Sequence, residues 1–149
     1  EFETEVLYHD QLFVAAGSQN HWTRKARVNL ADLLDGPWLL TPRDSESGRL
    51  AAEAFRTSGL NVPRANIVTS SLQLHNHLLE NGPFLSILPA SILPPLTKNS
   101  SLRTVAVSLP IQAGPVGIIR LRSRRLSSAA QLFIEITRLL TGSIQANPA

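Results

Sequence analysis

The feature that most constrains the fold is an apolar run, Trp38-Leu39-Leu40, followed after a short polar turn by a helical pattern. The run has no polar alternation, which predicts a strand buried on both faces, as in a parallel sheet. We expect the helix from about Ser45 to Ser58, with Gly59 as its stop. The same order returns at Asn66–Thr69 and in a helix that ends near Leu79. Strands that alternate with helices predict an α/β fold with a mostly parallel sheet.

Shorter apolar runs on both sides complete the expected elements. We expect further strands at 5–8, 12–16, 84–88, 102–107 and 116–121, a short helix at 30–34, and a helical turn and polar loop at 90–100. A last helix is expected to start at Ser127 or Ser128. Its apolar stripe consists of Ala129, Phe133, Ile136 and Leu140.

Composition excludes several classes of protein. The 149 residues are enough for one domain with a real core. Because there is no cysteine, disulfides and thiolate metal sites are excluded. No apolar run approaches the roughly 20 residues that a membrane helix needs, and the first ten residues do not resemble a signal peptide. We therefore expect a cytoplasmic protein without a membrane partner.

Hydroxyl-rich junctions follow both central strands and supply the candidate ligand-binding residues. These are Thr41, Pro42, Arg43 and Ser45 in the first junction and Thr69, Ser70, Ser71 and Leu72 in the second. In open α/β sheets, ligands bind at the carboxyl ends of strands, where the free N–H groups of helix starts attract anions. Two such junctions side by side would form a shared polar pocket. The alternative is that both are ordinary helix caps and that Arg43 is solvent-exposed.

The histidines, serines, carboxylates and the basic run of the chain do not indicate a metal site, a catalytic site or a nucleic-acid surface. His75 and His77 lie two apart, so on a helix they face opposite sides and cannot share a metal ion. The serines lack the nucleophile elbow of hydrolases, and the carboxylates lack a paired spacing, so we expect no enzyme, no metal and no cofactor. The basic run 120–125 has no interleaved aromatic residues, which is more typical of a solvated loop than of a nucleic-acid surface.

Several segments, taken together, resemble one protein family. They are Glu5–Asp10, Leu12–Gly17, Val28–Leu33 before Pro37–Leu40, Thr69–Ser71, Asn81-Gly82 before Leu85–Pro89, Pro115–Gly117 and 126–134. In this order, and over essentially the whole chain, they resemble the regulatory domain of LysR-type transcriptional regulators. One position departs from the family pattern: Phe84, preceded by Pro83, stands where the family has its second glycine. We expect this change to narrow the mouth of the pocket.

The resemblance implies a fold of two subdomains, similar to that of periplasmic solute-binding proteins. On this match, residues 17–89 form most of subdomain II, whereas 1–16 and 90–149 belong to subdomain I. The opening β-α-β-α-β segment of the regulatory domain and the family's winged helix-turn-helix are absent, so we expect a domain truncated at its N-terminal side. Open strand edges should then favour self-association.

The resemblance also implies a function. A small-molecule effector, often an organic acid, would bind the cleft between the subdomains and contact the two junctions. It would shift the DNA-binding state of a homo-oligomer, which touches DNA only through the absent N-terminal domain. The alternative is a solute-binding protein of a transport system with the same fold type; a small hydrolase is a third possibility.

Overall fold

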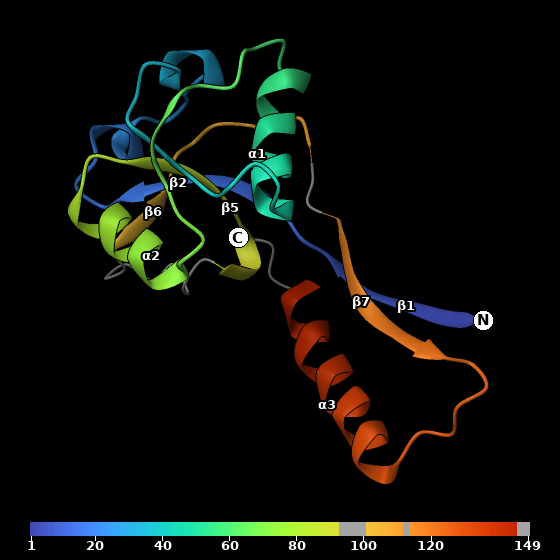
Figure 1. Cartoon of the computed structure of the whole chain (residues 1–149). Helices are drawn as coiled ribbons and strands as arrows, with labels where there is room; N and C mark the ends of the chain where they lie inside the picture. Colours follow the sequence, from blue (N-terminus) through green and yellow to red (C-terminus); the bar gives the residue numbers. More distant parts are fainter. Residues whose placement is uncertain (93–100, 112–113, 146–149) are drawn as a thin grey trace. The chain divides into compact units, whose positions relative to one another are not determined.

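The computed structural model describes residues 1–92, 101–111 and 114–145. Its strands are β1 (Phe2–His9), β2 (Leu12–Gly17), β3 (Trp38–Leu40), β4 (Ala65–Val68), β5 (Leu85–Pro89), β6 (Leu102–Thr104) and β7 (Pro115–Leu121). The helices are α1 (Glu46–Thr57), α2 (Leu72–Asn81) and α3 (Ser128–Gln145), with short 3₁₀ turns η1 (His21–Arg24), η2 (Leu30–Leu33) and η3 (Ala90–Ile92). Figure 1 shows their arrangement along the chain. Most of the expected loop at 90–100 lies outside the described residues.

The main sheet has five strands in the order β4-β3-β5-β2-β6. The central strand β3 runs parallel to both β4 and β5. Strand β2, in contrast, is antiparallel to both β5 and β6. The α/β fold is therefore confirmed, but the prediction of a mostly parallel sheet is wrong: half of the sheet is antiparallel because β2 runs back along β5.

Two apolar layers cover the two faces of this sheet. Trp38 and Leu40 of β3 belong to one cluster together with Phe55 of α1. The residue between them, Leu39, belongs to a second cluster with Leu79 of α2. Since successive side chains of a strand point to opposite faces, α1 and α2 cover opposite faces of the sheet. This confirms that β3 is buried on both sides.

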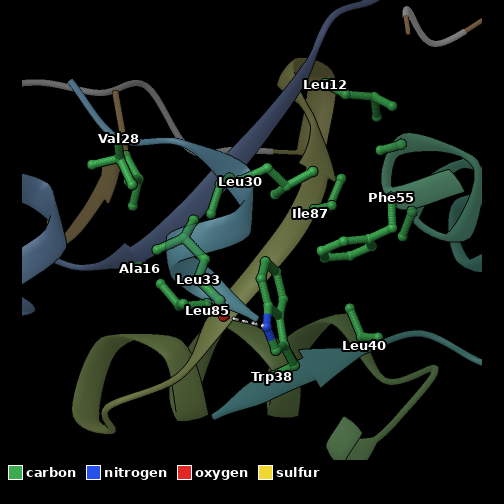
Figure 2. Packing of buried hydrophobic residues seen from close by; sticks show 14 residues of the cluster. Leu12, Ala16, Val28, Leu30, Leu33, Trp38, Leu40, Phe55, Leu85 and Ile87 are labelled. Carbon is green, nitrogen blue, oxygen red and sulfur yellow. Dashed lines mark hydrogen bonds between the residues drawn. The ribbon is translucent and has the colours of Figure 1, made fainter. Parts of the chain in front are cut away.

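Trp38 is the centre of the α1-side cluster. It is fully buried, and its indole Nε1–H donates a hydrogen bond of 2.9 Å to the carbonyl oxygen of Leu33 (Figure 2). Its ring meets that of Phe55 edge to face, with 5.1 Å between the centroids. Such a pair adds about 0.5–1.5 kcal/mol to the stabilisation that comes from area burial alone. The 3₁₀ turn η2 and helix α1 are therefore both tied to the first residue of β3.

Helix α1 ends as the sequence predicts, at Gly59. The N–H of Gly59 donates to the carbonyl of Arg56, and the N–H of Leu60 donates to that of Phe55. This pattern needs a left-handed residue after the helix, and Gly59 supplies it with a φ of 71°. Leu60 then packs against the same cluster as Phe55, which directs the chain back towards β4.

The chain divides into two compact units, Gln11–Ala113 and Glu1–Asp10 with Gly114–Ala149. These bounds differ from the expected division after residues 16 and 89. The physical reason is strand pairing, because β2 and β6 both belong to the five-stranded sheet of the larger unit. The expected assignment of 12–16 and 102–107 to the other subdomain does not follow this pairing.

The smaller unit consists of an antiparallel pair, β1 and β7, and helix α3. The guanidinium of Arg138 in α3 donates two hydrogen bonds, of 2.7 and 2.6 Å, to the carboxylate of Glu5. Across the strands, Arg120 pairs with Glu3 at 2.8 Å, and Arg122 lies 3.9 Å from Glu1. Two of the four arginines in the basic run 120–125 therefore have acidic partners within the unit.

The apolar stripe of α3 is present but exposed. Phe133 is 69% exposed and Leu140 65% exposed, and the far side of the strand pair also leaves Phe2 and Ile119 open. The helix instead turns a mixed side towards the strands, with Ile134 and Arg138 beside Glu5. Within the described residues, no helix combines the length and apolar character needed to cross a membrane.

Candidate functional site

The candidate site lies where β3, β4 and β5 end, within the larger unit. These strands run in the same direction, so their carboxyl ends meet at one edge of the sheet. A pocket of about 210 Å³ opens there. It is lined by Thr41, Pro42, Ser45, Ser47, Thr69, Ser70, Ser71, Leu72, His75, Leu88 and Ile92. The two hydroxyl-rich junctions therefore do form one pocket.

Of the eight candidate residues, only Arg43 is missing from the pocket lining. Its side chain is exposed, which agrees with the solvent-exposed alternative. The other seven lie together: Thr41, Pro42, Ser45, Thr69, Ser70, Ser71 and Leu72. Among the described residues, no Asp, Glu, Lys or Arg lines the pocket, so the polarity of this part of the lining comes from hydroxyls, the backbone and one imidazole.

The first wall of the pocket is the junction between β3 and α1. Ser45 is the N-cap of α1: its Oγ accepts a hydrogen bond of 3.1 Å from the N–H of Gly48 and donates one of 2.6 Å to the carbonyl of Pro42. Both capacities of this hydroxyl are used inside the turn. Ser45 therefore serves mainly to hold the Thr41–Pro42 backbone against the first turn of the helix.

The second wall is the junction between β4 and α2. The N–H of Thr69 donates to the carbonyl of Leu40, which joins this wall to the end of β3. Thr69 Oγ1 accepts a hydrogen bond of 3.1 Å from the N–H of Ser71, and Ser71 Oγ accepts one of 3.3 Å from the N–H of Leu74. Ser71 is thus the N-cap of α2, and both walls are the capped starts of helices.

Three hydroxyls of the pocket remain available to a ligand. The side chains of Thr41, Ser47 and Ser70 form no hydrogen bond within the part of the chain that the structure describes. They lie beside the starts of α1 and α2, where the first N–H groups of a helix have no partner inside it. Both helix dipoles also favour negative charge at this point. The arrangement can therefore hold a small polar or anionic molecule.

His75 is a pocket residue that sequence reasoning missed. It is 2% exposed, and its Nε2 lies 2.8 Å from the Oγ of Ser86 on β5. Burial lowers the pKa of His75, so the ring is neutral near pH 7. Spacing predicted correctly that His75 and His77 face opposite sides, because His77 is exposed. It could not reveal which side packs onto the sheet.

The hydrogen bond to Ser86 determines the tautomer of His75. Ser86 is 1% exposed, and its hydroxyl has no other partner within the described residues. If the ring donated to Ser86, the buried hydroxyl proton would lack an acceptor, at a cost of about 1–3 kcal/mol. The hydroxyl of Ser86 therefore donates to Nε2, and the proton of the neutral ring lies on Nδ1.

Two other features lie apart from this pocket. Phe84 is half-buried against the α2-side cluster and does not line the pocket, so the expectation that it narrows the mouth is wrong. A hollow of about 160 Å³ in the smaller unit is lined by Glu3, Glu5, Arg120 and Arg138, whose charges already pair with each other. No group of three or more metal-ligating side chains occurs among residues 1–92, 101–111 and 114–145.

A comparison with protein families gives a match along most of the sequence. The model described as the LysR substrate binding domain matches residues 1–139. The chain belongs to this family. The resemblance found in the segments of the sequence is therefore confirmed. A search of curated proteins found no match.

Solved structures of LysR proteins share the fold at low sequence identity. HinK, a LysR family transcriptional regulator from Pseudomonas aeruginosa, is 21% identical with a TM-score of 0.75; the match covers 95% of this chain and 50% of that one. The regulatory domain of CcmR from Synechocystis, in complex with 2-PG, is 17% identical with a TM-score of 0.77, covering 95% and 67%. The BenM effector binding domain with benzoate is 21% identical with a TM-score of 0.68, covering 99% and 67%. This LysR domain thus spans about half the length of the first solved chains it matches.

Proposed function

We propose that this chain is the small-molecule-sensing part of a LysR-type DNA-binding transcriptional regulator. The observation that carries the proposal is the pocket at the ends of β3, β4 and β5, where two capped helix starts present free hydroxyls side by side. Membership of the LysR substrate binding domain family supports it. The effector would contact Thr41 from one wall and Ser70 from the other.

The effector is proposed to be a small polar molecule, with organic acids as the leading class. The pocket volume of about 210 Å³ lies below the range of about 300–1,000 Å³ that is typical of sites for drug-sized ligands. Helix starts favour negative charge, and the lining residues that the structure describes include no acidic side chain to oppose it. Related domains are described with benzoate and with 2-PG, which fits a small effector here.

The proposed mechanism is a shift between arrangements of the whole regulator. An effector can change DNA binding only by as much as its affinity differs between the two arrangements. DNA would be contacted by a winged helix-turn-helix outside these residues, in a cytoplasmic homo-oligomer. The open apolar side of α3 supports self-association, which light scattering at increasing protein concentration would test.

We propose a binding role rather than catalysis for the pocket. An acyl-transfer site would need a nucleophile next to a general base. Among the lining residues in the described part of the chain, His75 is the only base; it is already bonded to Ser86, and Ser86 is buried away from solvent. Turnover of an ester panel that disappears in Ser70→Ala would overturn this part of the proposal.

The decisive experiment is an effector screen on the complete regulatory domain, followed by two pocket variants. A ligand at 100 times its dissociation constant raises the free energy of unfolding by about 2.7 kcal/mol, which thermal shift detects. In the full-length regulator, Thr41→Ala and Ser70→Ala should weaken the response to the hit, whereas Ser108→Ala, an exposed serine outside the pocket, should not. Normal responses from both pocket variants would refute the assignment.

A further inference from the structure

His75 joins the pocket to the interior of the sheet. His75 lines the pocket and is also bonded to Ser86 on β5, and among the described lining residues it is the only one with a titratable side chain. Nε2 is occupied by the Ser86 hydroxyl at 2.8 Å. Nδ1 has no hydrogen bond within the described residues. The ring therefore has one satisfied nitrogen and one free nitrogen.

The pocket is the opening beside the ring of His75. Among the described residues, the only buried side-chain nitrogen or oxygen without a partner is Oδ1 of Asn76. Nδ1 of His75 also forms no hydrogen bond with a described residue, and it is not one of these fully enclosed atoms. The opening next to this 2%-exposed ring is the pocket that it lines.

We propose that His75 is a specificity-determining residue of this pocket, where its Nδ1–H donates a hydrogen bond to a carboxylate oxygen of the ligand while Ser86 holds the ring in that tautomer. The inference rests on the proposed ligand-binding function and adds the residue that selects a carboxylate over a neutral ligand of the same shape. A carboxylate has two acceptor oxygens and no donor, so one can take the imidazole proton and the other can take a hydroxyl or a helix N–H.

The other groups of the pocket favour the same ligand class. The unbonded hydroxyls of Thr41 and Ser70 can each donate, and the starts of α1 and α2 present N–H groups. A cationic ligand would face two positive helix ends and a donor on His75, and no carboxylate among residues 1–92, 101–111 and 114–145 lines the pocket to balance it. The walls therefore recognise an anion, and His75 fixes where its oxygen sits.

The first part of the test reads the tautomer directly in the unliganded chain. Long-range ¹H–¹⁵N spectra distinguish a ring protonated at Nδ1 from one protonated at Nε2. We expect the His75 ring to be neutral at pH 7.5 with its proton on Nδ1, and Ser86→Ala to release this preference. A proton on Nε2 in the wild-type chain would overturn the proposal without any variant or ligand.

The second part uses benzoate as the anionic probe and benzamide as the neutral probe of the same shape. We expect benzoate to shift the His75 Nδ1 signal and to bind more tightly than benzamide. His75→Phe should weaken benzoate binding by about tenfold or more, because the lost hydrogen bond is to a charged group. His75→Asn, which keeps an N–H donor near the position of Nδ1, should recover most of the affinity, and the exposed His77→Phe should change nothing.

The outcomes separate this inference from the proposed function. Equal binding of benzoate by the wild type and His75→Phe, or equal binding of the two probes, would overturn the role of His75. If Thr41 and Ser70 signals still respond, the pocket remains the ligand site. If neither probe shifts any pocket signal, the carboxylate class is overturned. Only a broad metabolite panel that also leaves Thr41 and Ser70 unmoved would refute ligand binding itself.

Discussion

Gly48 touches the carbonyl group of Pro42, and no larger residue fits between them. A Cβ placed on Gly48 would overlap the carbonyl oxygen of Pro42 and lie 2.7 Å from its carbon. The first turn of α1 therefore sits directly on the backbone that forms one wall of the pocket. The Ser45 hydroxyl, which bonds the same carbonyl, holds the two in place.

We expect Gly48→Ala to destabilise the protein by about 1–3 kcal/mol, because the backbone of the wall must move to admit the methyl group. It should also weaken effector binding. Gly142→Ala is the matched control: this glycine also lies in a helix, but its Cβ would meet nothing within 4 Å. Its stability should stay unchanged or rise by up to about 1 kcal/mol, from helix propensity alone. Urea denaturation measures the free energy of unfolding of both variants. Equal free energies would show that the close approach of Gly48 to Pro42 does not affect stability.

We expect Ser45 to stabilise the helix start and Thr41 to contact the ligand, so substitutions at these two neighbouring hydroxyls should have different effects. Ser45→Ala removes an N-cap and should lower the free energy of unfolding by about 1 kcal/mol. Thr41→Ala should leave it nearly unchanged, because Thr41 forms no side-chain hydrogen bond among the described residues. In an effector titration, we expect Thr41→Ala to weaken the affinity for the effector more than Ser45→Ala does, although it costs less stability. A Thr41→Ala protein as unstable as Ser45→Ala would contradict this division of roles.

The ion pair between Glu5 and Arg138 should make the attachment of α3 depend on pH. The hydrogen bonds from Arg138 lower the pKa of the Glu5 carboxyl below its ordinary value of 4.5. A lowered folded-state pKa gives stability that is present above about pH 4.5 and is lost as the pH falls through the folded pKa. The protection factors of the α3 amides, which compare the exchange rate with the intrinsic rate at the same pH, should therefore fall in acid.

Glu5→Gln should lower the protection factors of the α3 amides at neutral pH and remove the part of their pH dependence that comes from the Glu5 carboxyl. Arg122→Gln is the control, since Arg122 lies 3.9 Å from Glu1 and both side chains are largely exposed. If exchange in α3 is insensitive to both substitutions, the Glu5–Arg138 pair does not hold the helix.

Burial of His75 should make the larger unit less stable in mild acid. Its pKa is lowered from the ordinary value of 6.5 because burial disfavours the charged ring. The unfolded chain therefore binds a proton more readily, so stability is full above about pH 6.5 and declines as the pH falls below that value towards the folded pKa. The urea midpoint, followed by a probe in the larger unit, should be lower at pH 5.5 than at pH 7.5. In His75→Phe the part of the difference due to His75 should vanish, whereas in His77→Phe it should persist.

Much of the site could be predicted because its determinants are local. Both N-caps, Ser45 and Ser71, are hydroxyls directly before an amphipathic run, and Gly59 follows one. The unalternating apolar run at 38–40 predicted a strand buried on both faces. Parallel strands then bring their carboxyl ends together, so the convergence of the two junctions followed from topology.

What could not be predicted depends on long-range pairing. Nothing within Leu12–Gly17 indicates that this strand runs antiparallel to β5, so the mixed sheet could not be predicted. The role of His75 needed the knowledge that its side of α2 faces Ser86, eleven residues away on β5. The stripe of α3 was correctly predicted as apolar, but periodicity cannot say what lies against it.

The buried position of Trp38 makes its intrinsic fluorescence a probe of the α1-side core. The protein has two tryptophans; Trp38 is fully buried against Phe55, whereas Trp22 is partly open to solvent beneath the ammonium group of Lys25. Emission from Trp38 should be blue-shifted and should move to the red only when the α1-side core opens. Trp38 begins β3, and Thr41 directly follows the end of that strand. Replacing Trp22 with phenylalanine would therefore leave a single fluorophore for following ligand titration and unfolding in one sample, without an added dye.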